Sequence, residues 1–90
     1  MSGIGWAVKE LWDGRRVRRS GWNGKDMWLE LQKPDERSEM TLPYVYMFTA
    51  QGDLVPWLCS QTDLLANDWQ QVTLPTKTVT LYPADDNADA

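Results

Sequence analysis

Two short segments hold most of the side chains that could do chemistry. The first, residues 19–25, reads Arg-Ser-Gly-Trp-Asn-Gly-Lys and sets one large aromatic ring on a glycine-flanked turn. An indole face can stack on a nucleobase for about 1–3 kcal/mol, an amide can pair with a base edge, and arginine or lysine can bind phosphate. The alternative is a hairpin whose Trp22 folds back onto a small core, and composition leaves both readings open.

The second segment, residues 56–63, reads Pro-Trp-Leu-Cys-Ser-Gln-Thr-Asp and joins a predicted strand to a predicted helical turn. Backbone amides at the start of a helix favour an anion, and Gln61, Thr62 and Asp63 add amide, hydroxyl and carboxylate groups. The alternative is helix capping alone, by Ser60 or Thr62.

Composition removes several function classes. The 90 residues include no histidine and one cysteine, so imidazole catalysis, a cysteine zinc site and an intramolecular disulfide are excluded. We expect Cys59 to be a small buried residue without a further role. A carboxylate pair such as Asp26 and Asp63 could transfer protons, but no motif supports that chemistry. We therefore expect a protein that is not an enzyme and that holds neither metal nor cofactor.

Charge is unevenly distributed along the chain. The net charge is −4, yet six of the nine basic residues lie between Lys9 and Lys25. Without the three acidic residues after position 84, the chain has ten acidic and nine basic side chains. This balance disfavours a nucleic-acid polymer as partner but permits a small anionic ligand. Residues 84–90 lack an apolar pattern, which predicts a single domain over 1–83 with a flexible acidic tail.

The elements that position the two segments are short. Apolar residues recur at helical spacing from Ile4 through Val8 to Trp12, and Asp13-Gly14 ends the pattern, which predicts a helix over residues 3–13. A single helical turn is predicted over 63–66. β-branched and aromatic runs between turn residues predict strands at 15–19, 27–31, 44–49, 54–58, 69–74 and 77–82.

Turn chemistry and one proline add detail to this plan. The turn-forming residues at 23–24 and 51–53 predict tight turns. Val17 should point into the core, and Pro56 marks an edge strand or a bulge. The expected fold is α+β, with one N-terminal helix on an antiparallel sheet. No apolar run is long enough to span a membrane, and Lys9 and Glu10 interrupt the N-terminal apolar stretch, so we expect a soluble cytoplasmic domain.

At the same two segments the chain resembles a known family, the small phage anti-defence proteins of the second Thoeris anti-defence type. Their pattern has an N-terminal helix ending in glycine, a basic strand, Arg-x-x-Trp-Asn-Gly-Lys, and later Val-Pro-Trp-Leu-x-Ser-Gln-Thr-Asp-Leu-Leu-Ala-x-Asp-Trp. Residues 19–25 match the first motif and residues 55–69 match the second. The chain departs from the family pattern in a short loop at 33–41 and a stretch after Val72.

The resemblance implies a sponge rather than a catalyst. Such proteins bind the cyclic ADP-ribose signal made by bacterial TIR-domain enzymes without cleaving it, as homotetramers with pockets at subunit junctions. Some also take cyclic dinucleotides at a separate site. This implies action inside the infected bacterial cell. The candidate ligand-binding residues are Arg19, Trp22, Asn23, Lys25, Met27, Trp57, Gln61, Thr62 and Asp63.

Within this set, we expect Trp22 to stack on the base or cap the pocket, Asn23 to bind a polar edge and Arg19 to meet phosphate. Asp63 is assigned to ribose hydroxyls, because a carboxylate beside a pyrophosphate is repelled. Two other functions stay open: a small β-rich interaction module that binds no nucleotide, and a binder of single-stranded nucleic acid, whose affinity would fall steeply with salt.

Overall fold

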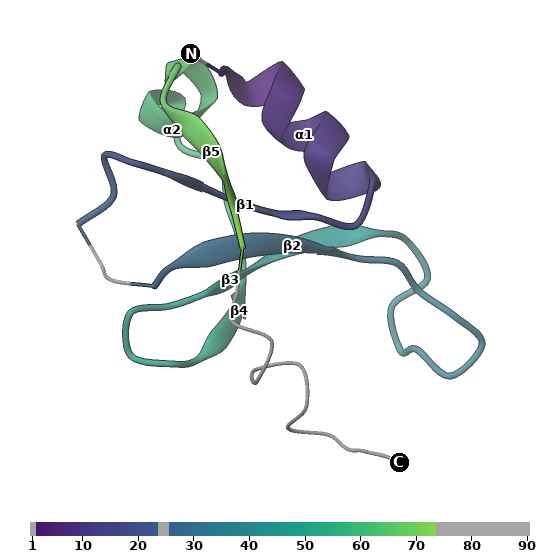
Figure 1. Cartoon of the computed structure of the whole chain (residues 1–90). Helices are drawn as coiled ribbons and strands as arrows, with labels where there is room; N and C mark the ends of the chain where they lie inside the picture. The colour runs from purple at the N-terminus through teal and green to yellow at the C-terminus, as the bar shows by residue number, and fades with distance from the viewer. Residues whose placement is uncertain (1, 24–25, 74–90) are drawn as a thin grey trace.

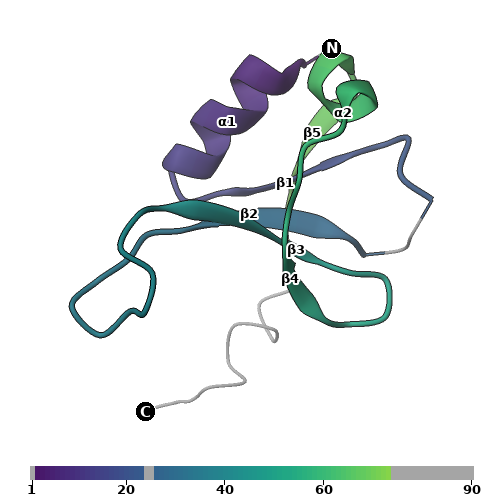
Figure 2. The same cartoon turned by 180° about the vertical axis from the view of Figure 1, so that it is seen from behind.

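The part of the chain that the structure describes forms a five-stranded antiparallel sheet with helix α1 (Ile4–Trp12) packed on one face (Figure 1). The computed structural model describes residues 2–23 and 26–73. Its elements are α1 (Ile4–Trp12), β1 (Arg16–Arg19), β2 (Trp28–Gln32), β3 (Tyr44–Phe48), β4 (Leu54–Pro56), α2 (Gln61–Leu65) and β5 (Trp69–Val72). The strand order is β4-β3-β2-β1-β5, with α1 lying over the sheet (Figures 1 and 2). The predicted α+β fold is confirmed.

Helix α1 contacts the core through a narrow row of apolar side chains. Ala7 and Leu11, four residues apart, are buried, and Ile4 is half-buried one turn earlier. Val8 and Trp12 belong to the same helical pattern but are exposed, so the buried line is narrower than the sequence predicted. The helix ends at Trp12 and is closed by Gly14, which has a positive φ of 87° and whose N–H bonds to the carbonyl of Leu11.

The core lies between α1 and the near face of the sheet. It consists of Ala7, Leu11, Val17, Leu29 and Trp69. Val17 points inward as predicted and is fully buried opposite Leu29 of β2. Side chains of a strand alternate between faces, so their neighbours in β1 and β2, among them Arg16 and Trp28, lie on the far face. There the Arg16 guanidinium sits 4.1 Å from the centre of the Trp28 ring.

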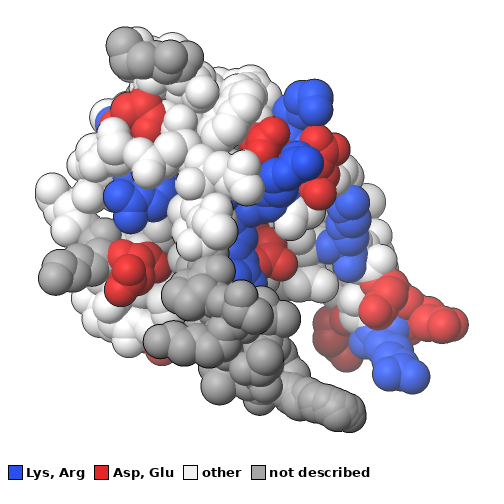
Figure 3. Space-filling view, in the orientation of Figure 1, with Lys and Arg blue, Asp and Glu red and all other residues white. Residues whose placement is uncertain are grey.

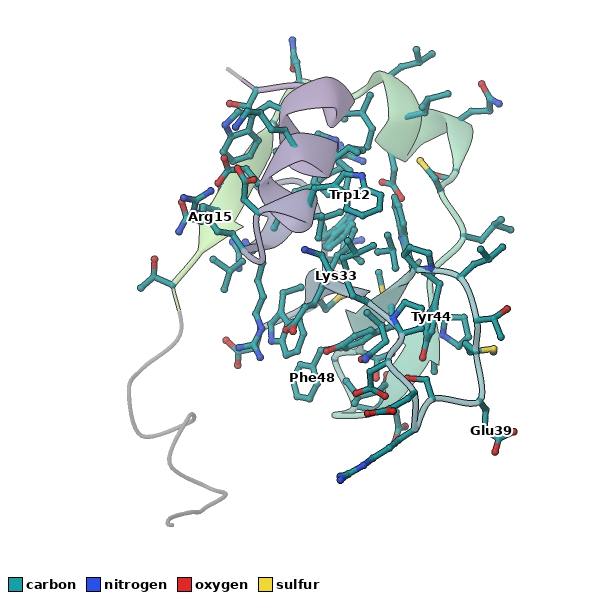
Figure 4. The ribbon with its side chains drawn as sticks, turned by 90° about the vertical axis from the view of Figure 1, so that its right-hand side faces the viewer. Trp12, Arg15, Lys33, Glu39, Tyr44 and Phe48 are labelled. Atoms are coloured by element: carbon teal, nitrogen blue, oxygen red, sulfur yellow. The ribbon has the colours of Figure 1, made fainter. Side chains whose placement is uncertain are left out.

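The lysine that follows β2 ties the loop after that strand to the end of α1. The Lys33 ammonium donates to the carbonyl of Trp12 at 3.1 Å and lies 5.9 Å from the centre of its ring (Figure 4). The face shown in Figure 3 carries basic and acidic side chains side by side rather than one uniform basic patch.

The strand boundaries agree with the sequence prediction to within two residues wherever the structure describes both ends. Strand β4 is shorter than predicted because it ends at Pro56, and it lies at the edge of the sheet, where a missing N–H is tolerated. The second turn is confirmed: Gly52 has a φ of 91°, and its N–H bonds to Thr49. The predicted strand at 77–82 and tail at 84–90 lie outside the described residues.

Helix α2 begins two residues earlier than predicted. Ser60 caps it by accepting a hydrogen bond from the Asp63 N–H at 3.1 Å, so Gln61 and Thr62 lie inside the first turn. Thr62 is therefore not the cap. The prediction of a start at 63 was wrong because it placed the first turn after the capping run instead of directly behind Ser60.

Candidate functional site

Strand pairing brings the two motif segments together. Strand β5 joins the edge of β1, with Arg19 directly opposite Trp69. The pairing continues past the strands, where the Ser20 N–H donates to the Asp68 carbonyl at 3.1 Å. In both views α2 and β5 lie at the same end of the molecule as the far end of β1 (Figures 1 and 2). The turn after β1 and helix α2 therefore form one local surface.

Arg19 lies at the centre of this surface, between two carboxylates. Its Nη1 is 2.9 Å from Oδ1 of Asp63, and its Nε is 2.7 Å from Oδ1 of Asp68. The three side chains are only 16%, 13% and 25% exposed, so solvent screens these ion pairs less than it would on an open surface. The hydrogen bonds that Arg19 donates to Asp68 and Asp63 raise the pKa of Arg19, which stays charged.

Both carboxylates are held in the ionised form. Burial favours the neutral acid of Asp63, but hydrogen bonds from Trp22 and Arg19 outweigh it and hold the pKa of Asp63 below its ordinary value. The pKa of Asp68 is lowered mainly by its hydrogen bond from Arg19, with help from the Gly21 backbone N–H. With one cation between two anions, the described part of this surface is acidic.

Trp22 both packs on the core and bonds to the candidate site. Its ring packs edge-on against Trp69, with centroids 5.5 Å apart at 80°, and it contacts the core. Its indole Nε1 donates to Oδ1 of Asp63 at 3.1 Å. The residue as a whole is half-buried. Trp22 is thus held by the fold without being fully buried.

Trp69 organises the surrounding aromatic residues. It is buried between Trp22 on one side and Trp57 on the other, at 5.5 and 6.0 Å between ring centres. Its Nε1 donates to the Asp63 backbone carbonyl at 3.1 Å, which joins β5 to α2. Sequence reasoning assigned no role to Trp69 or Asp68, although both lie in the second motif. Their role depends on the β1–β5 pairing, for which the local sequence has no signal.

The structure gathers part of the candidate set. Arg19, Trp22 and Asp63 are in direct contact, and Trp57 joins them through Trp69. Three further candidates lie beside this group and are exposed: Asn23, Gln61 and Thr62.

Two candidates are not placed in the group. Met27 is half-buried just before β2, and no hydrogen bond among the described residues joins its side chain to the others. Lys25 lies outside the described residues. The Arg19 guanidinium is already paired, so a phosphate would have to compete with two carboxylates for it.

Cys59 is exposed, and the expectation that it is buried was wrong. It lies in the extended segment between β4 and α2, where the chain leaves the edge of the sheet and is not covered by α1. Local desolvation and the nearby Asp63 carboxylate raise the pKa of the thiol. At neutral pH the thiol is therefore protonated and a poor nucleophile.

Other parts of the described chain offer less for binding or catalysis. No cluster of three or more His, Cys, Asp or Glu side chains within residues 2–23 and 26–73 could hold a metal ion. Neither helix in those ranges has the length or apolar character to cross a bilayer. An apolar hollow of about 220 Å³ lies away from Arg19, between β4 and the loop before β3. It is lined by Gln32, Met40, Tyr44, Tyr46, Leu54, Val55 and Pro56.

Comparison with known proteins gives two matches. Residues 2–72 match the model of a family described as "Thoeris anti-defense 2-like domain". A curated protein named "Thoeris anti-defense 2", from Bacillus phage SP01, is 35% identical over 83 residues, covering 78% of this chain and 93% of the relative. The family match includes both motif segments and all the strands described above.

Proposed function

The chain belongs to the Thoeris anti-defense 2-like family, and from that premise we propose that it binds a cyclic ADP-ribose-type signal nucleotide and sequesters it intact. Membership places the protein in phage anti-defence. The proposal adds the ligand and the mechanism: a signal held by this protein cannot reach the defence effector that it activates. The protein would act in the cytoplasm of the infected bacterial cell, where such a signal is made.

The observation that carries the proposal is the fixed position of Trp22 beside the first turn of α2. The indole is oriented by Asp63 and supported by Trp69, so its accessible part can receive a base without being ordered on binding. Asn23, Gln61 and Thr62 are exposed around it and offer amide and hydroxyl groups to base edges and ribose. A purine riboside needs this combination of ring and polar groups.

The phosphates need a different partner from the one that the sequence suggested. Arg19 is occupied by Asp63 and Asp68, and these carboxylates repel a pyrophosphate placed close to them. We therefore place the base and ribose at Trp22 and α2, and propose Lys25, the other basic residue of the first motif, as the partner of the pyrophosphate. Asp63 keeps its assignment to ribose hydroxyls, which can donate to a carboxylate oxygen.

A pocket shared between subunits suits so small a chain. Nanomolar affinity corresponds to about 12 kcal/mol, which requires most of a nucleotide's surface to be covered. The exposed apolar side chains Leu42, Leu54, Leu58 and Leu65 are available for contact with other copies. We propose a homotetramer. The same pocket, or one at another subunit junction, would accept a cyclic dinucleotide.

Isothermal titration with a panel of ligands tests this function. The panel contains cyclic ADP-ribose, a cyclic dinucleotide, linear ADP-ribose and a single-stranded oligonucleotide, each at two salt concentrations. We expect the first to bind tightly, with Trp22→Ala reducing affinity and Trp12→Ala, an exposed tryptophan at the end of α1, leaving it unchanged. Binding only of the oligonucleotide, falling steeply with salt, would indicate a nucleic-acid binder. Binding of no nucleotide would indicate an interaction module.

A further inference from the structure

Asp68, between α2 and β5, holds the turn that carries Trp22. Its Oδ1 accepts from the Nε of Arg19 at 2.7 Å, and its Oδ2 accepts from the backbone N–H of Gly21 at 2.8 Å and from the Ser20 hydroxyl at 3.2 Å. Its backbone carbonyl accepts from the Ser20 N–H at 3.1 Å. One residue of the second motif thus bonds to three consecutive residues of the first.

Gly21 is fitted to this carboxylate. A Cβ at position 21 would lie 2.9 Å from Oδ2 of Asp68, closer than real Cβ atoms come to a neighbour, and 3.1 Å from Nη2 of Arg19, which is a tight contact. A glycine at position 21 suits the close approach of the turn to Asp68, since a Cβ there would force the turn or the ends of the Asp68 and Arg19 side chains to shift.

Arg19 extends the connection to the indole. Its other edge bonds to Oδ1 of Asp63 at 2.9 Å, and the same oxygen accepts from Nε1 of Trp22 at 3.1 Å. A continuous chain of charge-assisted hydrogen bonds therefore runs from Asp68 through Arg19 and Asp63 to Trp22. Such bonds are about twice as strong as neutral ones, so the chain can fix the orientation of the indole before any ligand arrives.

We propose that Asp68 is a positioning residue that holds the Ser20–Asn23 turn in its binding geometry, and that Arg19 ties Asp68 to Asp63 rather than binding phosphate. This inference rests on the proposed function in one respect only, namely that Trp22 contacts the ligand. Losing the hydrogen bonds of the Asp68 carboxylate lets the turn sample other conformations. If the binding geometry is then populated a tenth of the time, the measured affinity falls about tenfold.

The test compares Asp68→Asn with a matched control, Glu30→Gln. Glu30 pairs with Arg16 in another part-buried ion pair, with a side chain 29% exposed against 25% for Asp68. The first readout needs no ligand: the indole N–H resonance of Trp22 in an ¹⁵N spectrum, assigned by its loss in Trp22→Phe. The second readout is the dissociation constant for cyclic ADP-ribose. We expect Asp68→Asn to shift and broaden the Trp22 signal and raise the dissociation constant about tenfold.

The expected result for Glu30→Gln is an unchanged Trp22 signal and unchanged affinity. If Asp68→Asn also leaves both unchanged while remaining folded, the inference is wrong. If Asp68→Asn does not fold, Gly21→Ala replaces it, since that variant keeps both carboxylates and only displaces the turn. An unchanged Trp22 signal in Gly21→Ala would then overturn the inference. If the wild type binds no cyclic nucleotide, the proposed function fails, and the indole signal alone decides the role of Asp68.

Discussion

Replacing Trp22 with alanine removes two contacts whose free energies can be worked out from the structure. The indole N–H bonds to the ionised Asp63, and a hydrogen bond to a charged group contributes about 1.5–3 kcal/mol. The edge-on contact with Trp69 adds about 0.5–1.5 kcal/mol beyond its buried area. Asp63 keeps Arg19 as a partner after the substitution, so we expect the loss of these two contacts to lower the free energy of unfolding by about 2–4 kcal/mol, with the lost burial of the indole adding to that cost.

Urea unfolding of three variants separates these contributions. Trp22→Phe keeps an aromatic edge against Trp69 but loses the N–H, so it should cost about 1.5–2 kcal/mol. Trp12→Ala is the control, because Trp12 is 51% exposed and its ring lies 5.9 Å from the Lys33 ammonium, and it should cost less than about 1 kcal/mol. For a domain of this size, each kcal/mol corresponds to about 4–8 °C in melting temperature.

Two results would refute this reasoning. If Trp22→Ala costs no more than Trp12→Ala, the indole is not held by Asp63 and Trp69 as described. If Trp22→Phe and Asp63→Asn are strictly additive in a double-mutant cycle, the hydrogen bond between them contributes nothing. Titration with cyclic ADP-ribose adds a third criterion. If folded Trp22→Ala binds as the wild type does, Trp22 is a core residue and not a ligand contact.

Three further predictions concern pH, the thiol and two glycines. Asp63 and Asp68 have lower pKa values in the folded protein than the ordinary carboxyl value of 3.8, so their ionised forms stabilise the fold at pH values above 3.8. This stabilisation should disappear as the pH falls through the pKa values of the two groups in the folded state. Urea melts between pH 6 and about pH 2 should show the loss, and Asp63→Asn should flatten it. The exposed Cys59 should react with a maleimide without denaturant, more slowly at pH 7 than free cysteine, and full protection in the native state would contradict its position. Gly52→Ala should destabilise the protein by about 1–2 kcal/mol, because Gly52 has a φ of 91°. Gly5→Ala should stabilise it by about 0.5–1 kcal/mol, because Gly5 lies in helix α1 and no atom comes within 4 Å of the added Cβ. Thermal melts in the reverse order would be inconsistent with both expectations.

Local sequence patterns predict the elements of this fold but not how they meet. The helical spacing from Ile4, the glycine at position 14 and the proline at position 56 each act on their immediate neighbours, and the structure confirms the helix, its end and the edge strand. The exposure of Val8 and Trp12 was missed because α1 contacts the sheet along a line set by tertiary packing.

In the candidate site, too, the residue types were predictable from the local sequence, but the contacts between them were not. Arg19, Trp22 and Asp63 were recognisable as residues with binding chemistry, and the structure brings them together. Their mutual engagement was not predictable, because it depends on β1 pairing with a strand about 50 residues further along the chain. Without that pairing, Arg19 is a free cation available to phosphate. With that pairing, Arg19 forms ion pairs with both Asp63 and Asp68, and Asp68 bonds to the turn that carries Trp22.

The central claim, sequestration without cleavage, is tested most directly by recovering the ligand. The protein in molar excess is incubated with cyclic ADP-ribose, the unbound fraction is removed by filtration, and the protein is then denatured by heat. The proposed function predicts that the nucleotide is depleted from the filtrate and that nearly all of it is released intact, with the same mass and chromatographic retention as the starting material. Release of linear ADP-ribose would show an enzyme, and a filtrate that still contains all of the cyclic nucleotide would show that this ligand is not bound.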